Sequence, residues 1–375
     1  MCYLIPAIFN SLGIIEDSTS QLYFISSRYL LPASLVLMTL SIDLKAIFNL
    51  GPKALIMFFT GTIGIIIGGP LAILLISTFS PETVGGVGPD AVWRGLSTLA
   101  GSWIGGGANQ AAMLEIYEYN PDLYGGMVLV DIVVANIWMA ILLLGIGRSE
   151  KIDKWLGADD SAITALKNKV ASYADSVTRN PSLADYMIML SIAFGAVGIA
   201  HFGADNISAW LVNNFEVFSD NKSSLASFAS SFFWMISIAT AIGIILSFTR
   251  FKTYEGAGAS KIGSVFIYIL VATIGMKMDL TMVFDNPGLI GIGLVWMAIH
   301  AALLILVAKL IKAPYFFLAV GSQANVGGAA SAPVVAAAFH PSLATVGVLL
   351  AVFGYVVGTY GAILSTILMQ LASGS

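Results

Sequence analysis

Long apolar stretches alternate with short polar segments along the whole chain, and this pattern predicts the architecture. A helix that crosses a membrane needs about 20 mostly apolar residues. Eight stretches are near or above this length, and each predicts one spanning helix: 22–42, 52–79, 126–147, 183–202, 225–248, 262–278, 288–311 and 343–371. The apolar stretch at 2–15 is shorter, and it predicts either half a helix or a truncated one.

Two further apolar stretches are interrupted by glycine clusters that carry amides and hydroxyls. The first, 92–117, contains the run Gly-Ser-Trp-Ile-Gly-Gly-Gly-Ala-Asn-Gln-Ala-Ala at 101–112. The second, 314–339, contains Gly-Ser-Gln-Ala-Asn-Val-Gly-Gly-Ala-Ala-Ser-Ala-Pro at 321–333. Each glycine costs a helix about 1 kcal/mol relative to alanine, so both runs predict a broken helix. Main-chain groups freed at membrane depth find no partner in lipid, so such breaks are tolerated only inside protein or beside water.

The composition agrees with a membrane protein. Hydrophobic residues make up 58% of the chain, against roughly 45–50% in a soluble domain. Charged residues make up 10%, against about 25%, which is too few to cover a soluble surface. The fold class is therefore all-α and polytopic, with the lipid bilayer as a partner. The net charge of −4 predicts no nucleic-acid partner.

The remaining chemistry of the chain excludes several kinds of site. The single cysteine, Cys2, excludes an intrachain disulfide and a cysteine-based metal site. The N-terminus has no basic segment before its apolar stretch, so we expect no cleaved signal peptide. No cofactor is expected other than a coupling ion, for which sodium is the candidate.

Short motifs recur in the same order in the two halves of the chain. Asp-Leu-x-x-Ile-Phe at 43–48 returns as Asp-Leu-x-x-Val-Phe at 279–284, a shift of 236 positions (279 − 43). Gly-Ser at 101–102 returns at 321–322, a shift of 220 (321 − 101). These matches predict two structural repeats, each with one broken segment.

The distribution of basic residues predicts how the repeats are oriented. The positive-inside rule places the basic segment 148–182 in the cytoplasm, and the basic cluster within 250–261 falls on the same side. If 92–117 is a hairpin that enters and leaves on one face, Lys45 and Lys53 also lie inside and the two repeats are inverted. The charges favour this arrangement, with one re-entrant hairpin from each face. A broken helix that crosses the membrane is the alternative.

The pattern divides the chain into five segments. We expect scaffold helices of the first and second repeats in 1–91 and 183–313, and a core with a broken segment in 92–148 and 314–375. The segment 149–182 is expected to be a cytoplasmic linker with an amphipathic helix on the membrane surface. Its apolar residues recur at helical spacing: Ile163, Leu166, Val170, Tyr173 and Val177. A solvated linker without that helix is the alternative.

Polar side chains at the two breaks predict a binding site near the middle of the membrane. Buried amides need partners, and a bound ion or solute would supply them. Close packing of small residues explains the glycines but not the amides. The candidate solute-binding residues are Ser102, Trp103, Asn109, Gln110, Gln323, Asn325 and Ser331.

Two carboxylates near the first break are candidates for ion coupling. Glu115 follows the break, and Asp131 lies inside the next apolar stretch with Asn136 further along it. A carboxylate at membrane depth is costly and is by default a hypothesis of function. Carboxylate and amide oxygens suit sodium, so Asp131, Asn109 and Asn325 are the candidate sodium ligands, while a carboxylate alone suits a proton. Glu115, Asp131 and Asn136, with Asn109 and Asn325, form the predicted ion-coupling set.

The two repeats differ at the candidate acid. The position that matches Asp131 in the second repeat is Ala351 (131 + 220), so an acid-dependent site would be asymmetric. Two simpler interpretations stay open. Glu115 could lie in water at the mouth of a hairpin, and Asp131 could pair two helices.

The two broken-segment motifs, together with Pro-Ala-Ser-Leu-Val-Leu at 32–37, resemble those of the YjcL-like family of bacterial integral membrane proteins. That family is named as a domain of unknown function, and the resemblance covers most of the chain. Its members usually have a further helix before the position of Cys2, so the resemblance implies that this sequence starts later than theirs. More distantly, the layout is similar to the sodium-coupled inverted-repeat transporters. That similarity implies a moving core that holds the broken helices and a scaffold that forms a homodimer.

Together these features predict an ion-coupled secondary active transporter, driven by sodium or protons, in the inner (cytoplasmic) membrane. The site between the broken segments would bind a small polar or anionic organic solute by alternating access, since it offers amides, hydroxyls and helix ends but no buried arginine. A channel or a non-transporting membrane receptor is the alternative. An intramembrane enzyme is less favoured, because no metalloprotease or hydrolase motif occurs and no enzyme activity is expected.

Overall fold

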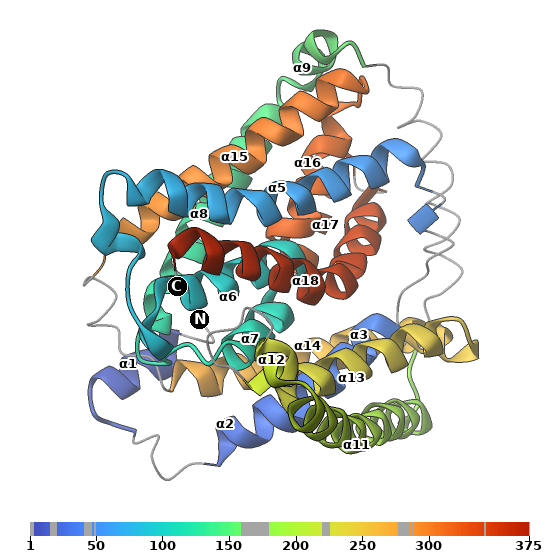
Figure 1. The fold of residues 1–375 in the computed structure, drawn as a ribbon. Helices are drawn as coiled ribbons and strands as arrows, with labels where there is room; N and C mark the ends of the chain where they lie inside the picture. The colour runs from blue at the N-terminus through green and yellow to red at the C-terminus, as the bar shows by residue number, and fades with distance from the viewer. Residues whose placement is uncertain are drawn as a thin grey trace.

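The protein is a bundle of helices. The computed structural model describes residues 4–15, 21–40, 47–48, 50–158, 180–219, 226–276, 286, 288–340 and 343–374 (Figure 1). Within these ranges no strand occurs. Six of the helices found there are long and apolar enough to cross a membrane, and a bent pair of helices could add a seventh. The predicted all-α polytopic membrane fold is thereby confirmed.

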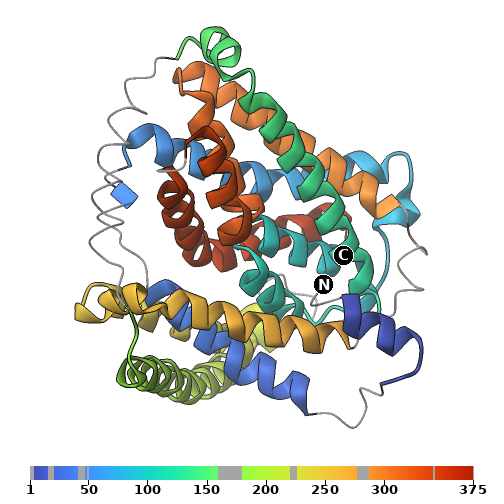
Figure 2. The same cartoon turned by 180° about the vertical axis from the view of Figure 1, so that it is seen from behind.

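One group of helices, which we call the lower layer, lies at the bottom of both views (Figure 1, Figure 2). Its first span, Leu22–Leu40, contains a π-helical turn at Ser26–Leu30. The elements of the layer are α1 (Leu4–Ser11), α2 (Leu22–Ile25), α3 (Leu31–Leu40), α11 (Leu183–Asn214), α12 (Glu216–Ser219), α13 (Ser231–Ser247) and α14 (Ala259–Gly275).

The remaining helices form a second group above it, which we call the hairpin bundle. It holds four long helices and two pairs of short ones: α5 (Pro52–Ser77), α6 (Val92–Gly105), α7 (Gly107–Ile116), α8 (Tyr124–Ile146), α15 (Gly288–Leu310), α16 (Tyr315–Val326), α17 (Gly328–Phe339) and α18 (Ala344–Ser373). A short helix, α9 (Ser149–Leu156), follows α8. Because α5 and α15 contact each other and the long helices α18 and α8, they belong to this bundle.

The expected division of the chain into five segments stays a prediction. The sequence analysis assigned 1–91 and 183–313 to a scaffold, which would include α5 and α15. In the structure these two helices pack on each other within the bundle, and Trp296 Nε1 of α15 donates to Ile65 O of α5 at 2.8 Å. Whether the lower layer and the bundle move as separate domains stays a prediction.

The first glycine run turns the chain back on itself. Helix α6 ends at Gly105 and α7 begins at Gly107. Gly106 between them has φ +80°, a main-chain conformation that residues other than glycine rarely adopt. Near the open end, Arg94 Nη1 donates to Tyr117 O, and the Trp93 and Tyr117 rings are 5.9 Å apart. Because its two ends meet, α6–α7 is a helical hairpin with its tip at Gly106.

The second glycine run forms a hairpin of the same kind. Helix α16 ends at Val326 and α17 begins at Gly328. The Phe339 ring at the end of α17 lies 5.3 Å from Phe316 and 5.8 Å from Tyr315 at the start of α16. Helices α16 and α17 therefore also meet at their open end.

The two hairpins open toward opposite ends of the bundle. The first is joined by a short loop to the start of α8 at Tyr124, while the second is tied to its far end, where Tyr315 Oη donates to Leu142 O at 2.8 Å. Helices α5 and α15 are antiparallel, since Lys53 at the start of α5 donates to Lys312 O just after α15, at 2.8 Å. An inverted repeat requires both the opposite directions of the hairpins and the antiparallel course of α5 and α15. That the two repeats of the sequence form inverted structural halves stays a prediction, because the motif residues Asp43 and Asp279 lie outside the described residues.

Several expected spans differ from the observed helices. The stretch 262–278 corresponds to α14, which begins and ends three residues earlier and, at 17 residues, is shorter than the six helices long enough to cross a membrane. The stretch 225–248 becomes α13, which bends by 97° into a 3-10 helix at Arg250–Ala257. Helix α11 extends beyond residue 202 because polar side chains are satisfied locally, as when Asn206 Nδ2 donates to Phe202 O at 2.7 Å. The predicted amphipathic helix of the linker lies largely outside the described residues.

Close packing of α18 against the first hairpin depends on a glycine. A Cβ at Gly358 would lie 2.6 Å from Gly105 Cα and 2.0 Å from Asn109 Nδ2. We therefore expect Gly358→Ala to lower the free energy of unfolding by about 1–3 kcal/mol through overpacking. The measurement is thermal unfolding of the purified protein in detergent. The matched control is Gly195→Ala in α11, where a Cβ meets nothing within 4 Å. Equal stability of the two variants would show that α18 does not pack on the hairpin as described.

Candidate functional site

The tips of the two hairpins meet in the middle of the bundle. A Cβ built on Gly328 would lie 3.7 Å from Gly106 Cα, which is ordinary van der Waals contact. Helix α18 crosses beside both tips, since a Cβ on Gly354 would lie 3.0 Å from Ile104 O and 3.3 Å from Ala324 O. The two breaks, far apart in the sequence, therefore form one structure.

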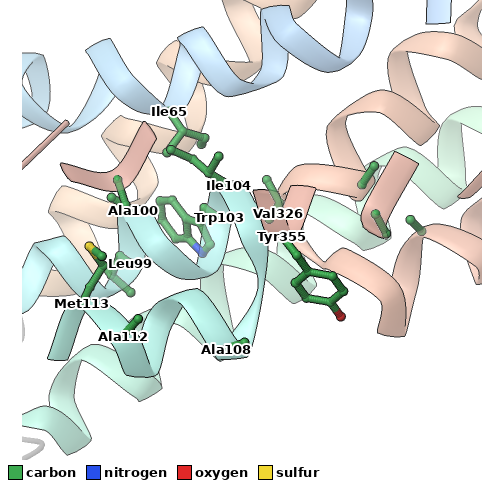
Figure 3. Close-up of a cluster of buried hydrophobic side chains, with 14 of the residues drawn as sticks. Ile65, Leu99, Ala100, Trp103, Ile104, Ala108, Ala112, Met113, Val326 and Tyr355 are labelled. Atoms are coloured by element: carbon green, nitrogen blue, oxygen red, sulfur yellow. The ribbon is translucent and has the colours of Figure 1, made fainter. Parts of the chain in front are cut away.

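Apolar side chains hold the first hairpin in place. Figure 3 shows Trp103 and Ile104 on α6 above Ala108 and Ala112 on α7, with Tyr355 of α18 beside the tip. All five are buried. This packing excludes water from the α6–α7 interface. It also holds in position the polar side chains that lie on the same two helices.

A cavity of about 230 Å³ lies between the hairpin tips and α8. The hairpins contribute the main chain of three glycines, Gly106, Gly107 and Gly327. The polar side chains that line it are Ser102, Asp131, Asn136, Gln323 and Ser331. Three of these five residues, Ser102, Gln323 and Ser331, belong to the predicted solute-binding set, and Asp131 and Asn136 belong to the predicted ion-coupling set.

Among the described residues that line this cavity, Asp131 is the only acidic one. Ser102 Oγ and Gln110 Nε2 donate to Asp131 Oδ2 at 2.8 and 3.2 Å, and Trp103 Nε1 donates to Oδ1 at 2.7 Å. The three donors are neutral, and no basic residue of the described chain forms an ion pair with Asp131. The carboxylate is thus held rigidly by hydrogen bonds while its negative charge is left without a counter-charge.

Gln323 reaches the cavity from the second hairpin. Its side chain is 1% exposed, and its Oε1 accepts a hydrogen bond from Ser331 Oγ at 2.8 Å. Its Nε2 has no partner among the described residues. A buried amide that lacks one partner costs about 1–3 kcal/mol, so this group is available to a bound molecule.

Asn325 belongs to the packing of the second hairpin rather than to the cavity. Its Nδ2 donates to Phe58 O and Gly321 O at 3.0 and 2.9 Å, and its Oδ1 accepts from Thr62 Oγ1 at 2.8 Å. All of its polar atoms are therefore used to join α16 to α5. Its predicted role in binding solute or sodium stays a prediction.

Asn109 lies behind the first tip, against α18. Its Nδ2 donates to Tyr355 O at 3.2 Å and to Thr359 Oγ1 at 3.4 Å, while Oδ1 is buried without a partner in the described chain. Asn109 does not line the cavity that holds Asp131. The structure therefore does not bring Asp131, Asn109 and Asn325 together as one sodium site, and no cluster of three His, Cys, Asp or Glu residues occurs in the parts described.

The predicted ion-coupling residues fall in two places. Asn136 lines the cavity with Asp131, although its Nδ2 donates to its own helix at Ile132 O, at 2.7 Å. Glu115 lines a different, larger cavity of about 1270 Å³ between the first hairpin and the lower layer. There Arg28 Nη2 lies 3.1 Å from Glu115 Oε2, and Tyr23 Oη also donates to Glu115.

The place of Arg28 beside Glu115 was not predicted from the sequence, because no buried arginine was expected near the sites. The side chain is 32% exposed, and its guanidinium lies 4.5 Å from the centre of the Phe232 ring. Its carbonyl, within the π-helical turn, bonds His201 Nε2 at 3.0 Å. An arginine inside an otherwise apolar span was the available signal.

His300 forms a second polar network inside the bundle. Its Nδ1 lies 3.0 Å from Gly61 O, a carbonyl that can only accept, so in the neutral ring Nε2 accepts from Ser322 Oγ at 2.8 Å. Ser322 Oγ in turn accepts from Trp138 Nε1 at 2.7 Å. The ring is fully buried. This network joins α5, α8, α15 and α16, so His300 is a packed, hydrogen-bonded residue.

Comparison with known proteins identifies relatives over nearly the whole chain. A family model described as "Protein of unknown function (DUF819)" matches residues 1–371. The "Uncharacterized membrane protein YjcL" of Bacillus subtilis (strain 168) is 24% identical over 358 residues, which cover 94% of this chain and 85% of that protein. The suspected resemblance to the YjcL-like family is confirmed.

The two amides of the second hairpin are expected to respond differently to mutation. Asn325→Ala removes three buried hydrogen bonds, those to Phe58 O and Gly321 O and the one from Thr62 Oγ1, so it should destabilise the protein by about 2 kcal/mol or more. Gln323→Ala removes one hydrogen bond, the one from Ser331, together with an amide nitrogen that has no partner in the described chain. It should therefore lower the free energy of unfolding by less than about 1 kcal/mol. Thermal unfolding in detergent compares the stabilities of the two variants. A larger loss for Gln323→Ala would contradict the assignment of Asn325 to packing.

Proposed function

From the premise that the chain belongs to the DUF819 family of membrane proteins, whose function is unknown, we propose that it is an ion-coupled secondary active transporter. Its cargo is a small organic solute that binds between the hairpin tips. The observation that carries the proposal is the meeting of Gly106 and Gly328 beside a cavity with a carboxylate. Paired breaks at corresponding places in two halves are the pattern of secondary transporters, whose sites lie near the midplane.

The arrangement of the hairpins favours a carrier over a channel. The hairpins reach the cavity from opposite ends of the bundle, and a Cβ on Gly328 would come into van der Waals contact with Gly106 Cα. A movement of one hairpin would open the cavity toward one side while the other hairpin keeps it covered. That is the requirement of alternating access, whereas a channel needs a continuous path past both tips.

The environment of Asp131 supports coupling to a cation. A carboxylate at membrane depth is costly unless it is paired or protonated. Its three described partners are neutral donors, which orient the group without neutralising it. A sodium ion or a proton would supply the missing charge, and release of that charge would be coupled to the movement of the hairpins.

The ion pair between the two groups of helices supports a moving interface. Arg28 belongs to the lower layer and Glu115 to the first hairpin, and both line the cavity of about 1270 Å³ that separates them. Partly solvated pairs of this kind contribute little net stability, typically about 0–1 kcal/mol, so they can break and re-form during a transport cycle. We place the protein in the cytoplasmic membrane and propose a homodimer formed through the lower layer.

Gradient-driven uptake tests the proposed function. Proteoliposomes receive a mixture of small organic solutes under an imposed sodium or proton gradient, and the accumulated compounds are identified by mass spectrometry. At least one solute should accumulate only with a gradient, and Asp131→Asn should reduce its accumulation at least tenfold because the coupling charge is lost. Asp122→Asn, in an exposed loop, is the control. Accumulation that ignores both gradients would refute ion coupling.

Cross-linking tests whether the Arg28–Glu115 contact has to break. In a Cys2→Ser background, Arg28→Cys and Glu115→Cys are combined and joined by a bifunctional methanethiosulfonate reagent. We expect transport to stop after cross-linking and to return after reduction, because the hairpin can no longer move relative to the lower layer. Each single cysteine variant, treated in the same way, controls for loss of the ion pair. Full transport by the cross-linked protein would rule out movement at this interface.

A further inference from the structure

The cavity beside the hairpin tips has two poles of opposite sign. We infer that the cargo of the transporter is a small zwitterion, a molecule with an ammonium group for Asp131 and a carboxylate for the hairpin tips. This inference rests on the proposed function and names the class of its cargo. It narrows the polar or anionic solute that the sequence alone suggested.

Asp131 forms the negative pole. An ionised carboxylate can accept about four hydrogen bonds. Ser102, Gln110 and Trp103 supply three, two to Oδ2 and one to Oδ1. One acceptor position remains on Oδ1, together with the whole negative charge. An ammonium group of the cargo would donate to that position and neutralise the charge while the cargo is bound, so the cargo and the coupling cation would occupy Asp131 alternately.

The hairpin tips form the positive pole through free N–H groups. Helices α7 and α17 begin at Gly107 and Gly328, and they contain 10 and 12 residues. The first N–H groups of a helix have no partner within it and carry partial positive charge. Because α6 and α16 end at the same tips, their dipoles oppose those of α7 and α17, and the attraction rests on hydrogen bonds from these N–H groups. Gly106, Gly107 and Gly327 line the cavity, so the main chain at both breaks is exposed to a ligand without intervening side chains. These are the conditions under which helix N-termini bind carboxylates.

Gln323 gives an independent indication of a ligand at the tips. The side chain is 1% exposed, lines the cavity and leaves Nε2 without a partner in the described chain. Ser331 donates to Oε1, which orients the amide with its nitrogen free. A carboxylate oxygen bound at the tips would accept a hydrogen bond from this nitrogen.

The size and charge of the cavity exclude simpler cargoes. Its volume of about 230 Å³ is the space of roughly eight water molecules at ~30 Å³ each, which suits a small metabolite. No lysine, arginine or histidine is among its described lining residues, so a plain anion would meet Asp131 without compensation. A plain amine would leave Gln323 and both helix N-termini unsatisfied. A zwitterion satisfies all of these groups at once.

Matched probes test the inference with the purified full chain in detergent. Binding is measured by titration calorimetry for glycine, alanine, serine, threonine, cysteine and proline. The same measurement is made for two analogues of alanine, propionate without the amino group and ethylamine without the carboxylate, and for the corresponding analogues of any other amino acid that binds. At least one amino acid should bind at least tenfold more tightly than both of its analogues.

Two variants separate the poles. Asp131→Asn should weaken the amino acid at least tenfold, to about the affinity of its carboxylate analogue, while Asp205→Asn, which changes an exposed acid of α11, should not. Gln323→Glu keeps an acceptor for Ser331 but adds negative charge at the tips. It should abolish amino-acid binding and leave the amine analogue bound. Should either variant fail to fold, the probe series on the unmodified protein still decides the question.

Two outcomes would overturn the inference: no amino acid binds, or a carboxylate analogue binds as tightly as its amino acid. The proposed function fails separately. If amino acids do not bind but another solute accumulates under a gradient, the transporter stands and the cargo class is wrong. If an amino acid binds as described but is not transported under any gradient, the cargo site stands and the transporter is wrong.

Discussion

The structure depends on one constraint, which is that main chain unwound at membrane depth must find partners inside the protein. Glycine runs break two helices, and lipid cannot satisfy the N–H and C=O groups that are freed. The protein places both breaks against each other, with Gly354 and Gly358 of α18 packed beside them. The same arrangement that hides the breaks from lipid creates a small polar cavity, so the structural solution and the candidate site are one feature.

The electrostatics of that cavity follow from the same arrangement. Two helix N-termini bring partial positive charge to the tips, and Asp131 on α8 faces them across the cavity. Hydrogen bonds from Ser102, Trp103 and Gln110 orient the carboxylate but add no positive charge. A site with a carboxylate that lacks a counter-charge, beside free N–H donors, favours a ligand that carries both charges. Once that ligand has left, the carboxylate can bind the coupling cation.

Much of this could be predicted from the sequence because glycine runs and buried polar residues have few uses in a membrane. The breaks, the hairpins and the proximity of Ser102, Asp131, Gln323 and Ser331 all follow from local chemistry. The roles of Asn109 and Asn325 could not be predicted, because an amide that binds cargo and an amide that joins two helices look alike in a sequence. Which one it is depends on neighbours 250 or more positions away, such as Thr359 and Phe58. Pairing of Arg28 with Glu115 was missed for the same reason.

The most direct test of the account is the side of the membrane from which each hairpin opens. In a Cys2→Ser background, single cysteines replace Asp122, in the loop after the first hairpin, and His340, at the end of the second, both of which are exposed. A membrane-impermeant thiol reagent is applied to right-side-out and to inverted vesicles. The account predicts that Asp122→Cys is labelled only in right-side-out vesicles and His340→Cys only in inverted ones. Labelling of both positions from the same side would contradict it.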